Sequence, residues 1–370
     1  MNRDQRLVVE LGARSYEVVV GSGLLGRAGP ALAGVLRRPD AIIVTDANLA
    51  GTPHLGVLEG SLEAAGIARR RIVLPSGEST KSMTQLAELL DRLLDLGVDR
   101  ATTIVACGGG VIGDLAGFAA AILLRGLDCV QVPTTLLAQV DSAIGGKTGI
   151  NTRHGKNLVG AFHQPRLVLA DTAVLASLPV RELRAGYAEV VKYGLIDRPD
   201  FFAWLEAHGR EVLAGDAAAQ QHAVVESCRA KAAVVAADER EGGVRALLNL
   251  GHTFAHALET ACGYGDELLH GEAVALGLVL AFELSVRLGL CPAADAERVR
   301  AHLGAVGLPT TLGAVRSAGF DRVALLAAMG HDKKAEAGRP RFVLTRGIGR
   351  AFAGVEVATA DLEALLEAAA

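Results

Sequence analysis

The chain has 370 residues, a formal net charge of −4 and 51% hydrophobic residues. This length predicts two domains, and the negative charge argues against nucleic acid as a partner, because phosphate backbones select basic surfaces. The longest apolar run, 273–282, is bounded by Glu272 and Glu283 and is far shorter than the roughly 20 residues that a bilayer requires. The charged start is not followed by an apolar segment, so we expect a cytoplasmic protein with no membrane partner.

Short apolar runs alternate with helical patterns in the first half of the chain. The predicted strands cover residues 41–45, 71–74, 102–106, 129–132 and 167–169, and a predicted helix covers residues 81–96. Such alternation is typical of a mainly parallel sheet covered by helices. We therefore expect an α/β N-terminal domain over residues 1–175, with a Rossmann-like, mainly parallel sheet.

A glycine-rich turn follows the predicted strand at 102–106. Residues 108–113 are GGGVIG, which satisfies G-x-G-x-x-G and leads into a helical pattern. Glycine lets the backbone approach a pyrophosphate, and a helix N-terminus supplies free N–H groups. A strand-to-helix turn without a ligand is the alternative. The acidic residue expected about 20 residues further on, for the ribose, has no clear occupant, so Asp46 takes that role in our interpretation, and the pattern indicates a variant dinucleotide site.

The segment 141–157 is rich in glycine and polar residues, and we expect it to be irregular. It contains GGKT at 145–148, but Asp141 stands where a Walker A motif requires glycine, which excludes an ATPase of that type. Each lysine taken singly is more often a solvated surface charge. As a group, these residues and cations from elsewhere would suffice to hold a small anion such as phosphate. The group consists of Asp141, Lys147, Lys156, Asn157, Arg125 and the run Asp332-Lys333-Lys334.

The second half is dominated by long segments with helical periodicity. They cover residues 201–213, 217–238, 248–261 and 272–288, and one hairpin is predicted around residues 341–357. We therefore expect an all-α C-terminal domain over residues 176–370.

Three histidines stand close together in this half. His252 and His256 are at i and i+4 of a predicted helix and share a face, while His270 would have to return from a following element. Imidazole is the commonest protein ligand for a catalytic transition metal. The spacing does not decide which histidines bind metal, and histidines with a purely structural role are the alternative.

Charged residues precede these histidines at helical spacing. Glu189 and Lys192 stand at i and i+3, and Arg245 and Asn249 stand at i and i+4. An isolated E-x-x-K pair is usually a surface ion pair. The apolar surroundings favour an inward-pointing Glu189. The pattern indicates a pocket with a metal, oxygen ligands and fixed positive charge.

Eight motifs follow one another over nearly the whole chain: SGESTK (76–81), GGGVIGD (108–114), VPTTLLAQVDS (132–142), GGKTGIN (145–151), GKN (155–157), AEVVK (188–192), LNLGHT (248–253) and HGE (270–272). In this order they resemble the motifs of 3-dehydroquinate synthases. The resemblance implies that Glu189, His252 and His270 bind Zn2+, or alternatively Co2+, and that His256 contacts substrate and transfers protons.

The resemblance also implies a reaction. Such enzymes convert 3-deoxy-D-arabino-heptulosonate 7-phosphate into 3-dehydroquinate and phosphate, in the shikimate pathway of aromatic amino acid biosynthesis, by transient oxidation with NAD+, phosphate elimination, reduction and aldol cyclisation. The implied cofactor residues are Asp46, Glu78, Lys81, Gly110, Val111, Asp114, Thr134, Thr135, Lys147 and Lys156.

The remaining implied residues bind substrate or handle protons. The phosphate set is Lys147, Asn157, Asn249, His256, Lys333 or Lys334, and Arg125 reaching in from the neighbouring subunit of a homodimer. Lys231 and Arg245 would hold the substrate carboxylate with Lys192 close by, Glu241 and His256 would handle protons, and Asp141 completes the catalytic set.

Three alternatives are distinguishable. An amino-dehydroquinate or valiolone-type sugar-phosphate cyclase is the nearest, although the valiolone type tends to lose the histidine that matches His256. A metal- and NAD-dependent polyol dehydrogenase would not need the cation cluster. A non-catalytic nucleotide-binding regulator would not need three metal ligands.

Overall fold

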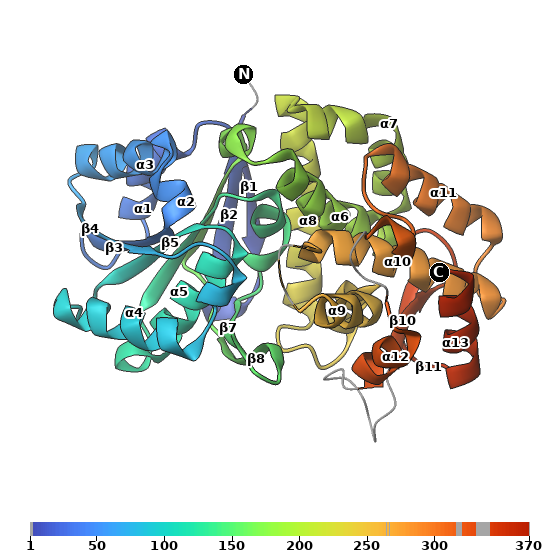
Figure 1. Cartoon of the computed structure of the whole chain (residues 1–370). Coiled ribbons are helices and arrows are strands. Elements are labelled where there is room, and N and C mark those ends of the chain that lie inside the picture. Colours follow the sequence, from blue (N-terminus) through green and yellow to red (C-terminus); the bar gives the residue numbers. More distant parts are fainter. Residues whose placement is uncertain (1–2, 264, 266, 316–319, 331–340, 370) are drawn as a thin grey trace. The chain divides into compact units, whose positions relative to one another are not determined.

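The computed structural model describes residues 3–263, 265, 267–315, 320–330 and 341–369 (Figure 1). The chain forms two compact units. The first comprises residues 1–178 and 220–239, and the second comprises residues 179–219 and 240–370.

The first unit contains a seven-stranded sheet with the order β1-β2-β9-β6-β5-β3-β4. Its strands are β1 (Gln5–Val9), β2 (Tyr16–Gly21), β3 (Asp40–Asp46), β4 (Ala68–Leu74), β5 (Thr103–Gly108), β6 (Asp128–Pro133) and β9 (Leu167–Asp171). All neighbouring strands are parallel except β1, which is antiparallel to β2. The predicted, mainly parallel Rossmann-like sheet is confirmed, with β1 and β2 as strands that the hydrophobic pattern did not reveal.

Helices cover both faces of this sheet (Figure 1). They are α1 (Ala28–Ala33), α2 (Ala47–Ala50), α3 (Pro53–Ala64), α4 (Met83–Asp95) and α5 (Gly110–Ile122). Ile43 packs in one core with Leu58 of α3, whereas its neighbour Ile42 packs in the other with Leu115 of α5. Successive strand residues point to opposite faces, so both faces need apolar residues and the strands appear as continuous apolar runs.

The segment after β6 is a hairpin, not the irregular stretch that the glycines suggested. Strands β7 (Lys147–Thr152) and β8 (Gly155–Phe162) pair antiparallel. A Cβ atom on Gly160 would lie 2.0 Å from the Thr148 carbonyl oxygen. Glycine is therefore required there because the two backbones approach closely, which is compatible with a strand.

Helix α8 (Ala217–Ala237) belongs mainly to the first unit. Two contacts join it to the segment after β6: the Cys228 thiol lies 3.4 Å from the Gln139 carbonyl oxygen, and Lys231 Nζ lies 2.7 Å from Asp141 Oδ1. A helix that follows α6 and α7 in the sequence thus completes the α/β unit.

The second unit is helix-rich, as predicted, and also contains the expected hairpin. Its helices are α6 (Val180–Asp197), α7 (Pro199–Ala214), α9 (His252–Ala261), α10 (His270–Arg287), α11 (Ala293–Ala305), α12 (Arg322–Gly330) and α13 (Thr359–Ala368), and the hairpin consists of β10 (Arg341–Thr345) and β11 (Ala351–Glu356). Helix α10 packs against α6, α9, α11, α13 and β10, which explains the apolar run 273–282. Within the described ranges, no helix is long and apolar enough to cross a membrane.

Candidate metal and cofactor sites

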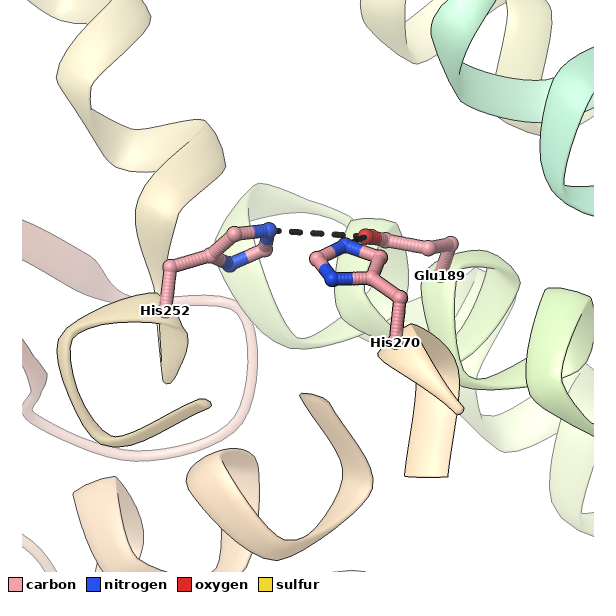
Figure 2. A group of neighbouring side chains, drawn as sticks. All are labelled: Glu189, His252 and His270. Atoms are coloured by element: carbon pink, nitrogen blue, oxygen red, sulfur yellow. Dashed lines mark ion pairs between the residues drawn. The ribbon is translucent and has the colours of Figure 1, made fainter. Parts of the chain in front are cut away.

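Three predicted metal ligands meet in the second unit. Glu189 lies within α6, while His252 and His270 are the first residues of α9 and α10. The Nε2 atoms of both histidines lie 3.4 Å from Glu189 Oε1. Figure 2 shows both rings turned toward this carboxylate, and one ligand atom from each residue lies within 4.8 Å of the others.

Glycines allow the three helices to approach so closely. A Cβ atom on Gly271 would lie 1.8 Å from the Ala185 carbonyl oxygen of α6. Gly251 has φ 79°, and its Cβ atom would lie 2.7 Å from the Leu278 nitrogen of α10. The glycines beside His252 and His270 therefore place α9 and α10 at the cluster formed by Glu189, His252 and His270. Because of this turn, α9 begins at His252 and not at Leu248 as predicted.

The Glu189–Lys192 pair is buried, which excludes the surface ion pair. Lys192 Nζ lies 2.6 Å from Glu189 Oε2, and the two side chains are 1% and 0% exposed. Burial alone would raise the pKa of Glu189, but Lys192 and the two imidazoles hold it well below its usual range. Glu189 is thus an ionised carboxylate whose Oε2 contacts the lysine and whose Oε1 faces the histidines.

Both imidazoles present the same nitrogen to Glu189. The His252 Nδ1 atom lies 3.2 Å from the Leu250 carbonyl oxygen, and the His270 Nδ1 atom lies 3.1 Å from Glu259 Oε2. Each Nδ1 therefore has an acceptor, which leaves Nε2 for a metal. Burial and Lys192 lower the pKa of His252, whereas at His270 the carboxylates of Glu259 and Glu189 outweigh burial and raise the pKa to about 10.

The chemistry of these donors fits a transition metal. Glu189 Oε1 is fully buried and accepts no hydrogen bond from the described residues. Two imidazole nitrogens and one carboxylate oxygen form the three-ligand set of many catalytic zinc sites, in which another position stays open for substrate. Sequence reasoning did not identify Glu259, although it stands seven residues after His252, two helical turns along α9.

Other predicted residues of the second unit lie near the cluster in sequence or space. His256 is exposed, and its ring centroid is 5.6 Å from that of His252 and 6.5 Å from that of His270. Asn249 Nδ2 donates to Glu241 Oε1 at 2.9 Å, and Arg245 is buried. Lys333 and Lys334 lie outside the described residues.

The predicted dinucleotide turn lies at the carboxyl end of the parallel sheet in the first unit. Gly110 begins α5, directly after β5 ends at Gly108. Asp46 ends the adjacent strand β3 and accepts a hydrogen bond from the Leu49 N–H. In the sheet, β4 lies on one side of β3 and β5 lies on the other, so the strand order reverses at β3. The carboxyl ends of β3 and β5 therefore flank a topological switch point, which is where sheets of this kind bind ligands. Thr134 and Thr135 follow the end of β6.

Lys81 connects several predicted residues of the first unit. Its buried ammonium group donates to Asp114 Oδ2 and to Asn157 Oδ1, both at 2.6 Å. Burial raises the pKa of Asp114, although Lys81 opposes this shift. Lys156 lies 3.7 Å from Glu78, and Glu78 also accepts a hydrogen bond from Asn151.

This arrangement joins Asn157, which was predicted to bind phosphate, to the cofactor residues. It also adds Asn151, the last residue of the GGKTGIN motif, for which the sequence predicted no role. Lys147 is exposed on β7. Lys231 lies on α8, with Nζ 2.7 Å from the carboxylate of Asp141.

Backbone strain coincides with predicted site residues. Among the described residues, the non-glycine positions with positive φ are Leu124 (49°), Arg125 (68°), Asn157 (54°) and Glu241 (63°). Such conformations are uncommon outside glycine and persist only where the surrounding structure imposes them. Three of these four residues were predicted from the sequence to act in the site.

Comparison with solved structures gives the class of protein. The chain superposes on 2-epi-5-epi-valiolone synthase from Streptomyces hygroscopicus with NAD+ and Zn2+ bound, with a TM-score of 0.87 and 32% identity, covering 97% of each chain. It also superposes on 2-deoxy-scyllo-inosose synthase complexed with carbaglucose-6-phosphate, NAD+ and Co2+, with a TM-score of 0.85 and 26% identity, covering 99% of this chain and 100% of that one. The fold is that of the sugar-phosphate cyclases.

The sequence gives a narrower assignment. Residues 71–185 match the N-terminal domain model of 3-dehydroquinate synthase, and residues 186–335 match the C-terminal one. The 3-dehydroquinate synthase of Rhodospirillum rubrum is 64% identical, covering 98% of this chain and 94% of the relative. The chain belongs to the 3-dehydroquinate synthase family.

Proposed function

We propose that this chain converts 3-deoxy-D-arabino-heptulosonate 7-phosphate into 3-dehydroquinate and phosphate, with NAD+ and a divalent metal. The observation that carries the proposal is the convergence of Glu189, His252 and His270 in a chain that is 64% identical to a 3-dehydroquinate synthase over 98% of its length. The reaction class is that of a carbon–oxygen lyase that eliminates phosphate and closes a ring.

The first unit would hold the cofactor. The α5 N-terminus would present free N–H groups to a pyrophosphate, and Asp46, at the end of the neighbouring strand, would bind a ribose hydroxyl. Lys81 holds Asp114 and Asn157 in place, and Lys156 and Glu78 add further polar groups. The other residues proposed for this site are Gly110, Val111, Thr134, Thr135 and Lys147.

The second unit would hold the metal and part of the substrate. When bound, the metal would supply a Lewis acid for substrate oxygens, and NAD+ would supply a transient hydride acceptor. Within this unit, the buried Arg245 would be a fixed cation for the substrate carboxylate. His256 is exposed beside the metal ligands and so would be accessible for proton transfer.

The charge of the cluster suits an anionic substrate. A dication bound by two neutral imidazoles and the Glu189 carboxylate keeps a charge of about +1. The Glu259 carboxylate neutralises this charge, and the Lys192 ammonium group brings the net charge of the cluster back to about +1. An alkoxide that forms on a substrate hydroxyl would therefore meet net positive charge. The site has many positioning groups and few dedicated bases, which fits elimination assisted by the departing phosphate itself.

We further propose a homodimer in which Arg125 enters the phosphate pocket of the neighbouring subunit. The strained turn at Leu124 and Arg125 projects from the end of α5, and α5 also packs against β8. Large apolar side chains are exposed on these two elements: Ile122, Leu158 and Phe162 are each 42–43% exposed. A second copy covering them would remove apolar surface from water and place Arg125 at an interface.

The function is tested by measuring phosphate release and NADH absorbance together. With the 7-phosphate substrate and substoichiometric NAD+, phosphate should be released over many turnovers while NADH does not accumulate. NADH without phosphate would instead support a polyol dehydrogenase, and neither product would favour a nucleotide-binding regulator. The matched aminated substrate distinguishes the amino-dehydroquinate variant.

A further inference from the structure

The strongest unassigned group next to the proposed site is the carboxylate of Glu259. It lies on α9, its residue is 1% exposed, and its Oε2 atom is 3.1 Å from His270 Nδ1. A buried carboxylate carries a large desolvation penalty unless charged or hydrogen-bonding groups compensate it. Its contact with the ring of a proposed metal ligand therefore needs a functional or structural reason.

We propose that Glu259 is a positioning residue that orients His270 and strengthens its bond to the metal. This inference rests on the metal site of the proposed function. The carboxylate accepts the proton on Nδ1, so that the Nε2 lone pair points to the metal. The negative charge beside the ring also makes Nε2 a more basic ligand.

The second histidine shows why a carboxylate matters at His270. The His252 Nδ1 atom faces the neutral Leu250 carbonyl oxygen at 3.2 Å, which orients the ring without adding a charge. Both histidines begin their helices, but His252 is buried, whereas the His270 side chain is 31% exposed. A charged partner would keep this more exposed ring oriented although water competes for its Nδ1 atom. Both histidines therefore offer Nε2 to the metal, but the Nδ1 partner is a neutral carbonyl oxygen at His252 and a carboxylate at His270.

A structural ion pair between α9 and α10 is the alternative. It would stabilise the packing of the helices with or without metal, and its loss would lower the stability of the metal-free protein without changing zinc affinity. The positioning role instead predicts weaker zinc binding and an unchanged stability of the metal-free protein, because a hydrogen bond to a metal ligand acts on the metal-bound state. Zinc affinity and metal-free stability therefore separate the two readings.

The experiment measures zinc affinity by chelator competition in full-length wild type, Glu259→Gln and Glu259→Ala. Glutamine keeps an acceptor of similar shape without the charge, and alanine removes both. Loss of such an outer partner typically costs ~10–100-fold in metal affinity. We expect a loss of this size in Glu259→Ala and a smaller loss in Glu259→Gln.

Glu272→Gln is the matched control. Glu272 is a carboxylate in the first turn of α10, the helix that begins with His270. It accepts a hydrogen bond from the Leu269 N–H and pairs with Arg181 instead of contacting the His270 ring. Its replacement should leave zinc affinity unchanged. An equal loss in this control would show a general charge effect and would overturn the inference.

A spectroscopic measurement makes the test independent of activity. In zinc-bound protein labelled with 15N-histidine, His270 should show a hydrogen-bonded Nδ1–H signal that is protected in wild type and exchanges rapidly in Glu259→Ala. Unchanged affinity and an unchanged signal would overturn the positioning role. A wild-type protein that binds no zinc would overturn the proposed metal site itself, which is a different outcome.

Discussion

Replacing Lys192 with methionine should make the protein bind zinc more tightly. Lys192 Nζ lies 2.6 Å from Oε2 of Glu189, whose other oxygen faces the two histidines. The same ammonium lowers the pKa of His252, so its charge opposes a second positive charge at this site. A zinc ion would be such a charge. Lys192 therefore stabilises Glu189 in the metal-free protein and repels the metal when it arrives.

The size of the effect follows from the burial of the pair. Removing one partner of a fully buried ion pair costs ~3–5 kcal/mol, because the remaining charge is left uncompensated. In Lys192→Met, the metal-free protein should lose stability of this order, whereas bound zinc compensates Glu189 directly. By thermodynamic linkage, each ~1.4 kcal/mol of this lost stability that bound zinc restores raises the zinc affinity of the variant tenfold. We expect an increase of at least about tenfold.

The assay combines chelator competition with thermal unfolding, with and without zinc. Without metal, Lys192→Met should unfold at a lower temperature than wild type. With zinc, the difference between the two unfolding temperatures should be smaller. Lys156→Met, which removes a lysine from the first unit, is the control and should not change zinc affinity. Equal or weaker zinc binding by a natively folded Lys192→Met would refute the reasoning.

Further predictions concern the metal, the proton and the dimer. His252→Ala should lose zinc and activity together, because an open site cannot lose one of three protein ligands, whereas His256→Ala should keep zinc and lose rate; metal analysis of the purified variants checks both. Zinc affinity should rise with pH, by up to about tenfold per unit below the metal-free His270 pKa of about 10, because zinc displaces one proton; chelator competition at several pH values that shows no slope would contradict this. Arg125→Ala and His252→Ala should each be nearly inactive alone, and subunit exchange should restore up to about half of the activity in each heterodimer. Full activity of Arg125→Ala alone, or no recovery after demonstrated exchange, would exclude the shared site.

The sequence predicted the sheet because its strands are buried on both faces. Runs such as 102–106 are apolar without alternation, and the glycine-rich turn follows at the expected end. The β7–β8 hairpin was mistaken for an irregular stretch because its glycines resemble breaks. Gly160 is present because another backbone passes close to it, and that backbone is visible only in the fold.

The cluster of Glu189, His252 and His270 shows what spacing alone can decide. Spacing placed His252 and His256 on one helical face, but only the fold brings Glu189 and His270 to the same point. An E-x-x-K pair has the same sequence whether it lies on a surface or in a core, so the resemblance, and not the pattern, selected Glu189. Glu259 went unnoticed for the same reason, since its partner is on another helix.

The spread of the three proposed metal ligands along the chain also determines when the proposed site can be completed. A ribosome-bound chain that has not yet released α10 presents only Glu189 and His252, which is too few donors for tight zinc binding. The site is complete only after residue 270 has emerged and α6, α9 and α10 have packed together. If these three residues bind zinc, tight binding therefore requires the packed helices, and zinc bound there would stabilise the folded protein.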